Sequence, residues 1–112
     1  MDIDQWKSQL RKGAAELVVL ALLEAKPSTG VALLDALSSH PDIGISDGAM
    51  YPLLQRLERE ERIKGKWQLP DKGERPIKIY TLQPTGRKAL KQMRESWALF
   101  SQDVTKMLGA NS

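Results

Sequence analysis

The sequence predicts a mainly α-helical domain that carries one β-hairpin and ends in a long helix. Three observations point to this fold class. Before residue 58, apolar residues recur at three- and four-residue spacing in three segments, which is typical of amphipathic helices. Two alternating segments, residues 62–69 and 77–82, flank a polar turn bounded by prolines, as in a hairpin. A heptad pattern between residues 90 and 107 predicts a further helix with an apolar seam.

The first two helices are separated by a proline. Asp4 is expected to cap a helix that runs to about Ala25, and Pro27 ends it because proline cannot continue the hydrogen-bond ladder. Ser28 or Thr29 then caps a short second helix over residues 30–38. The apolar positions of the first helix form one stripe, made of Trp6, Leu10, Ala14, Leu17, Val18, Ala21 and Leu22.

The third helix contains a proline, so its start is open to two interpretations. Ser46 or Asp47 can cap it, and Ser46 is favoured, which predicts a helix kinked at Pro52. The alternative is a helix that begins at Pro52 itself. In either case one apolar face is expected, made of Met50, Leu53, Leu54 and Leu57.

The hairpin follows at once. Its first strand places Ile63, Gly65, Trp67 and Leu69 on one face and Lys64, Lys66 and Gln68 on the other. Residues 70–76 form the turn, and residues 77–82 form the return strand. A short helix followed by a charged hairpin is the layout of a winged helix-turn-helix, with the hairpin as the wing.

The last helix is expected over residues 84–108, with Pro84 at its first position. It is long relative to the small body, so its distal half is expected to pack on a twofold-related copy. The alternative is that it folds back on the first helix, and both can hold if Trp6, Leu10 and Ala14 lie between two last helices. The predicted dimer interface is the heptad seam, made of Leu90, Met93, Trp97, Phe100, Val104 and Met107.

Charge is distributed unevenly along the chain. The formal net charge is +3, yet residues 1–55 sum to −3, residues 56–94 to +7 and residues 95–112 to −1. The positive charge therefore falls on the end of the third helix, the wing and the start of the last helix, where a polyanion would bind. The alternative is an ordinary solvated surface rich in Lys and Arg.

Several classes of function are excluded by composition. The chain has no cysteine, and its lone histidine, His40, lies in a loop segment without a catalytic or metal-binding pattern around it. We therefore expect no enzyme, no metal site and no cofactor. The longest apolar stretch, Leu17–Leu23, is too short to cross a bilayer, and the acidic N-terminus is unlike a secretion signal. These features predict a cytoplasmic protein that does not interact with a membrane.

Together the elements predict a DNA-binding winged helix-turn-helix domain over residues 1–83 and a C-terminal dimerisation helix over residues 84–112. Small residues at the front of the third helix let its backbone approach DNA, and Gln55 can pair bidentately with adenine. Three of these features also have an explanation without DNA. Tyr51 can belong to the core, Arg56 can pair with Glu60 four residues later, and the cations of the wing can simply be solvated. The predicted contacts to double-stranded DNA are Gly48, Ala49, Tyr51, Gln55, Arg56, Lys66, Lys72 and Arg75.

Several motifs resemble the PadR family of transcriptional regulators. The match runs through Lys12-Gly13, Gly30, the segment from Gly48 to Glu58 with its Tyr51-Pro52 pair, Tyr80-Thr81-Leu82, and Gly86 with Leu90. The resemblance implies a small member of the family, a dimeric repressor in which a single C-terminal helix forms the dimer. The chain departs from the family at Val31, at Gln83 and at Glu61, where glycine is usual. A left-handed backbone at Glu61 would cost about 1 kcal/mol relative to glycine.

The resemblance also implies a ligand site. Some PadR-like proteins that sense drugs hold flat aromatic compounds between two tryptophans, one from each subunit, and Trp97 lies in the corresponding region. The walls of such a pocket for a hydrophobic or aromatic effector would be Trp6, Leu10, Met93, Trp97 and Phe100. The alternative is that Trp97 only fills the dimer core. Two other functions stay open: a winged-helix protein-interaction module without its own operator, and a small-molecule carrier.

Overall fold

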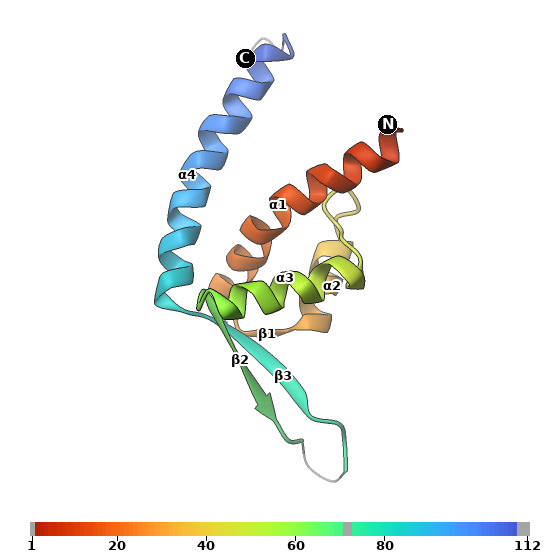
Figure 1. Cartoon of the computed structure of the whole chain (residues 1–112), viewed down its shortest axis with the longest axis vertical. Coiled ribbons are helices and arrows are strands. Elements are labelled where there is room, and N and C mark those ends of the chain that lie inside the picture. The colour runs from red at the N-terminus through yellow and green to blue at the C-terminus, as the bar shows by residue number, and fades with distance from the viewer. Residues whose placement is uncertain (1, 71–72, 110–112) are drawn as a thin grey trace.

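The computed structural model of the chain describes residues 2–70 and 73–109. Its mostly helical body carries a three-stranded antiparallel sheet, and the hairpin and the last helix extend from it in opposite directions (Figure 1). The elements are α1 (Ile3–Ala25), β1 (Ser28–Thr29), α2 (Gly30–Ser38), α3 (Asp47–Arg59), β2 (Ile63–Gln68), β3 (Ile77–Leu82) and α4 (Pro84–Met107). The part of the chain that the structure describes holds no helix long and apolar enough to cross a membrane.

Helix α1 begins two residues earlier than the sequence predicted. Asp2, not Asp4, is the N-cap, and its Oδ1 accepts a hydrogen bond of 2.8 Å from the Gln5 N–H. Both aspartates are chemically suitable caps, and the helix gains two residues when Asp2 is used. The helix ends at Ala25, as predicted, and the following Lys26 is extended ahead of Pro27.

The face of α1 that enters the core is also different from the predicted stripe. The buried residues are Ala15, Val19, Leu20 and Leu23, whereas Trp6 and Leu10 are half exposed. Residues 17–23 are apolar on every side of the helix, so spacing alone could not decide which side is innermost. Several members of the predicted stripe pack around the edge of the core instead, namely Leu17, Val18, Ala21 and Leu22.

A two-residue strand between α1 and α2 was not predicted. Ser28 pairs with Tyr80 and Thr29 with Ile79, so β1 forms the third strand of the sheet, beside β3. Thr29 then caps α2 by accepting a hydrogen bond of 3.1 Å from the Ala32 N–H. Two residues are too few for an alternating pattern, which explains why the sequence gives no strand signal here.

Helix α3 starts after Ser46, as favoured from the sequence, although the Ser46 side chain makes no capping hydrogen bond. The helix runs through Pro52, and the kink predicted there stays a prediction. Proline at this position cannot donate to the Gly48 carbonyl one turn earlier, and Gly48 is exposed, so water can satisfy that carbonyl. Met50, Leu54 and Leu57 are fully buried in the core, and Leu53 lies at its edge. This apolar face fixes which side of α3 is turned outward.

The end of α3 is a left-handed cap. Glu61 has φ of 60°, its N–H donates to the Glu58 carbonyl, and the Arg62 N–H donates to the Leu57 carbonyl, both at 3.0 Å. These two bonds define a Schellman motif, in which glycine is the usual left-handed residue. The strain expected for Glu61 is therefore present in the folded chain.

The wing is a regular hairpin whose register runs from Ile63 opposite Leu82 to Gln68 opposite Ile77. Its first strand is two residues shorter than predicted, because Arg62 and Leu69 lie outside the ladder. At its base, Ile63 and Tyr80 are buried in the core. The rest of the wing projects away from the body (Figure 1).

Helix α4 is docked at its start and exposed along its distal half. Pro84 occupies the first turn, Gln83 provides no side-chain cap, and Thr85 Oγ1 donates a hydrogen bond to the Glu61 carbonyl. A Cβ added to Gly86 would lie 2.0 Å from the Arg62 carbonyl oxygen, so no other residue fits this contact. Farther along, Arg94 pairs with Glu24 of α1 at 2.8 Å.

Candidate nucleic-acid interface

The outward face of α3 carries the residues predicted to read DNA. Because Met50 and Leu54 are buried, Tyr51 and Gln55 point away from the core, one helical turn apart. Gly48 is exposed and Ala49 is half buried at the front of the same helix. A Cβ at Gly48 would meet only Ser46 Oγ, at 3.7 Å, so the fold itself does not require glycine there. The small residues therefore leave open space at the start of the helix.

Tyr51 is a surface residue, not a core residue. Its side chain is 40% exposed, and its ring lies against the backbone of Gly30 at the start of α2. A Cβ on Gly30 would be 2.8 Å from the Tyr51 ring, which explains why glycine stands in this turn. The contact holds the phenol in place while leaving it accessible, so the alternative of a core tyrosine is wrong.

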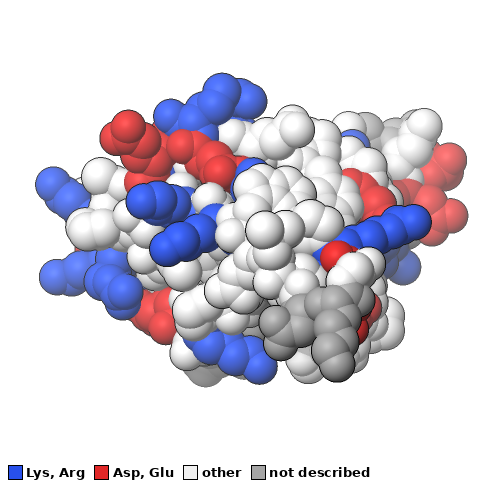
Figure 2. All heavy atoms as spheres, turned by 90° about the horizontal axis from the view of Figure 1, so that it is seen from below, with Lys and Arg blue, Asp and Glu red and all other residues white. Residues whose placement is uncertain are grey.

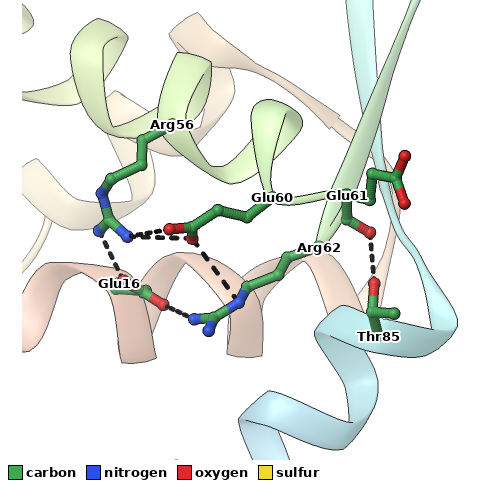
Figure 3. Close-up of polar contacts among 6 residues, drawn as sticks. All are labelled: Glu16, Arg56, Glu60, Glu61, Arg62 and Thr85. Carbon is green, nitrogen blue, oxygen red and sulfur yellow. Dashed lines mark hydrogen bonds and ion pairs between the residues drawn. The ribbon is translucent and has the colours of Figure 1, made fainter.

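Arg56 takes the alternative role that the sequence left open. Its guanidinium donates to Glu16 of α1 at 2.6 Å and to Glu60 at 3.1 Å (Figure 3). The hydrogen bond that Arg56 donates to the Glu16 carboxylate is the main cause that raises the pKa of Arg56. The partner on α1 was not predicted, since it lies forty positions away in the chain. Arg56 therefore has the structural role that the sequence left open, and its predicted contact with DNA stays a prediction.

The wing supplies a second row of side chains. Lys66 and Arg75 are exposed, as predicted, and Lys72 lies outside the described residues. Lys78 pairs with Glu58 of α3 at 2.7 Å, which fastens the wing to that helix and raises the pKa of Lys78. Its ammonium group also lies 5.7 Å from the centre of the Trp67 ring, within cation–π range.

Trp67 was missed as a candidate functional residue. The alternating pattern placed Trp67 on the same face of the strand as Ile63 and suggested no further role for it. Its side chain is nevertheless 63% exposed, because it lies beyond the edge of the core. It borders a hollow of about 470 Å³ between α3 and the wing. Val31, Tyr51, Gln55, Ile77 and Lys78 also line this hollow. Exposed tryptophans are uncommon on protein surfaces, and that exposure could be seen only in the fold.

The excess of basic residues between positions 56 and 94 does not form a single patch. Arg56, Arg62, Lys78 and Arg94 are neutralised by glutamates. Seen from the side of the wing, Lys and Arg lie around a centre that is mostly uncharged (Figure 2). Within residues 2–70 and 73–109, seven cations of this region have no acidic partner within 4.0 Å: Arg59, Lys64, Lys66, Arg75, Arg87, Lys88 and Lys91.

The seam of α4 divides into a buried start and an exposed remainder. Leu90 is fully buried in the core of its own chain, so its assignment to a dimer interface was wrong. It lies where α4 still packs on the body. Beyond it, Trp97 is 46% and Phe100 60% exposed, with ring centres 6.2 Å apart, and Val104 and Met107 are exposed as well.

A groove of about 490 Å³ separates the exposed part of α4 from α1. Four of the five predicted pocket residues line it, namely Leu10, Met93, Trp97 and Phe100, together with Gly13, Ala14 and Leu17. Trp6 does not line the groove, because it lies a further turn toward the N-terminus of α1. Leu10, Met93 and Phe100 therefore share one surface with Trp97, as predicted, whereas Trp6 does not.

Comparisons with known proteins agree on one family. No curated protein sequence matches the chain. Among solved structures, a PadR family transcriptional regulator from Eggerthella lenta is 29% identical, with a TM-score of 0.85, covering 97% of this chain and 94% of that one. A PadR-like regulator from Bacillus cereus is also 29% identical, with a TM-score of 0.78, covering 90% and 97%.

The family model gives the decisive match. The PadR-like transcriptional regulator model matches residues 19–92, which include most of the body, the wing and the start of α4. This match confirms the predicted fold, a winged helix-turn-helix with a long C-terminal helix. It also confirms the prediction that the protein is a transcriptional regulator and not an enzyme. The chain belongs to the PadR-like family of transcriptional regulators.

Proposed function

We propose that this protein is a dimeric, sequence-specific DNA-binding repressor that acts in the cytoplasm. The observation that carries the proposal is the outward face of α3, where Tyr51 and Gln55 are accessible above a firmly buried apolar face. A helix held in this way can enter a major groove without losing its own packing. The PadR-like family match supports the assignment to DNA.

Each exposed residue has a role that its chemistry allows. Gln55 would pair with adenine, and the Tyr51 hydroxyl would donate to a phosphate at the edge of the groove. Gly48 and Ala49 would let the backbone at the start of α3 approach the DNA. Lys66 and Arg75 would contact the backbone or the neighbouring minor groove from the wing, and Lys72 would do the same at its turn.

The dimer is proposed to form along the exposed seam of α4. Met93, Trp97, Phe100, Val104 and Met107 give this helix an apolar face that its own chain leaves partly or largely exposed. A second copy related by a twofold axis would cover it and place two α3 helices about one DNA turn apart. Half-buried Trp6 and Leu10 on α1 would lie near the same interface.

The first test is binding to duplex DNA from upstream of the protein's own gene, against a scrambled duplex, across a salt series. We expect a preference for the native duplex that persists near physiological salt. Equal and steeply salt-dependent binding would show only phosphate attraction. Absence of binding even at low salt would refute the DNA function and leave the protein-interaction module, for which the exposed Val31, Trp67 and Ile77 are the suitable surface.

Two variants separate base reading from phosphate attraction. Gln55→Ala is expected to weaken binding to the preferred duplex by about 5- to 100-fold and to leave scrambled DNA unchanged. Lys66→Ala is expected to weaken both and to reduce the salt slope by about 1. Gln102→Ala is the matched control, because Gln102 is exposed on α4 outside the seam. An equal loss for Gln55→Ala on both duplexes would contradict the assignment of Gln55.

An effector is proposed to occupy the groove beside Trp97, where release of DNA would follow from a changed angle between the two α4 helices. The probe is ethidium, a flat aromatic cation, added to the protein without DNA. If the groove is a ligand pocket, Trp97→Ala should no longer bind ethidium but should remain dimeric by sedimentation. A loss of the dimer would instead assign Trp97 to the interface core.

A further inference from the structure

A cluster of four alternating charges joins α1, α3 and the start of the wing. Glu16 on α1 is the central member, and its side chain is only 15% exposed. Its Oε1 accepts from Arg56 of α3 at 2.6 Å, and its Oε2 accepts from Arg62, which leads into β2 (Figure 3). One carboxylate therefore holds two elements of the DNA-binding face at once.

Glu60 closes the cluster from the other side. Its carboxylate accepts from Arg56 at 3.1 Å and lies 3.7 Å from Nε of Arg62. Two acidic and two basic groups give no net charge, so this cluster has little attraction for phosphate. Its geometry serves to fix helices relative to one another, since charged hydrogen bonds from a planar guanidinium demand a defined orientation.

The cluster also lies between the DNA-binding face and the groove that α1 shares with α4. Gly13 and Leu17, which flank Glu16 along α1, line that groove. On the opposite side, the carbonyls of Glu61 and Arg62 contact the first turn of α4 at Thr85, Gln83 and Gly86. Both walls of the groove are thus connected to α3 through residues 56–62.

We propose that Glu16 is a positioning residue for DNA recognition: it sets the orientation of α3 and the wing relative to α1 without touching DNA. This inference rests on the proposed DNA-binding function. The buried side chains Met50, Leu54 and Leu57 hold α3 on the body, but apolar contacts are non-directional and permit small rotations. The directional bonds that Arg56 and Arg62 donate to Glu16 act in the last turn of α3 and just beyond it, where a small rotation displaces the exposed face.

The test compares Glu16→Gln with Glu24→Gln. Glu24 lies on the same helix and pairs with Arg94 of α4, outside the cluster, so it is a matched control. A preferred duplex is selected from a random pool by the unmodified protein, and binding to it and to a scrambled duplex is measured for each variant. Glu16→Gln is expected to lower the preference by about tenfold, and Glu24→Gln to leave it within about twofold.

Two further readouts separate positioning from other roles. Binding to scrambled DNA should be unchanged or tighter in Glu16→Gln, because Arg56 and Arg62 are released, whereas a misfolded variant would lose both affinities together. Glu16→Asp keeps the charge and should keep more of the preference than Glu16→Gln. An unchanged preference in Glu16→Gln would overturn the inference. Tighter binding of Glu16→Gln to the selected duplex would overturn it as well, because Arg56 would then be a residue that reads bases and is restrained by Glu16.

Hydrogen exchange of the protein without DNA makes the outcome independent of finding an operator. Amides in the last two turns of α3 are expected to exchange faster in Glu16→Gln than in the unmodified protein or in Glu24→Gln. If this occurs and no duplex is selected from the pool, the proposed DNA function fails while the mechanical role of Glu16 stands. Unchanged exchange in α3 would refute the positioning role itself.

Discussion

Replacing Glu61 by glycine should stabilise the protein, although Glu61 is the native residue. Its φ of 60° lies in the left-handed region, and the backbone bonds of the cap, from Glu61 to Glu58 and from Arg62 to Leu57, are already made. The left-handed conformation costs an ordinary residue about 1 to 2 kcal/mol. Glycine avoids that strain but loses about 0.5 to 1 kcal/mol through the greater freedom of the unfolded chain. The midpoints of these two ranges give an expected net gain of about 0.75 kcal/mol for Glu61→Gly.

The assay is reversible thermal and urea unfolding followed by circular dichroism, at one fixed protein concentration because dimerisation would shift the midpoint. A gain of this size corresponds to an increase in Tm of roughly 2 to 6 °C. Glu61→Ala is the control, since it removes the carboxylate but keeps the left-handed strain, and it should change stability little. If Glu61→Gly had no effect, or if alanine gave the same gain, the strain argument would be refuted.

Three more predictions follow from the packing and the pKa shifts. Gly86→Ala should destabilise the fold by about 1 to 3 kcal/mol, because its Cβ would overlap the Arg62 carbonyl; unfolding at the unmodified midpoint would contradict this. Leu54→Ala should lower the unfolding free energy by about 2 to 5 kcal/mol, measured in urea, because Leu54 is fully buried. Burial raises the pKa of Tyr80 above its ordinary 10.0, and Glu58 raises that of Lys78 above 10.5. Folding therefore favours the protonated forms, so their contribution is complete below about pH 10 and is lost as pH rises further. Unfolding free energy measured from pH 8 to 11 should fall at the alkaline end, less steeply in Tyr80→Phe, and a rise there would contradict the sign.

The helices and the hairpin could be predicted because each has a local signal. Ser46 and Pro84 mark helix starts, prolines bound the turn of the wing, and alternation marks its strands. The innermost face of α1 could not be predicted, because residues 17–23 are apolar on all sides and only tertiary packing chooses among them. The same holds for β1, whose two residues become a strand only by pairing with β3.

The candidate site was predictable in part for a similar reason. Tyr51 and Gln55 follow from the helical period once the buried face is known, so their exposure agrees with the sequence pattern. The true partner of Arg56 could not be found in this way, since Glu16 lies forty residues earlier and the sequence offered only Glu60, four residues later. Leu90 was misassigned because a heptad pattern does not show where a helix leaves its own domain.

The tight contact at Gly86 has a consequence for how motion would travel through the molecule. There is no room for a side chain between Gly86 and the Arg62 carbonyl, so the base of the wing and the start of α4 are in close backbone contact. The wing and α4 extend from this point toward opposite ends of the molecule (Figure 1). Because this contact leaves no free space, a tilt of α4 is expected to displace the base of the wing as well.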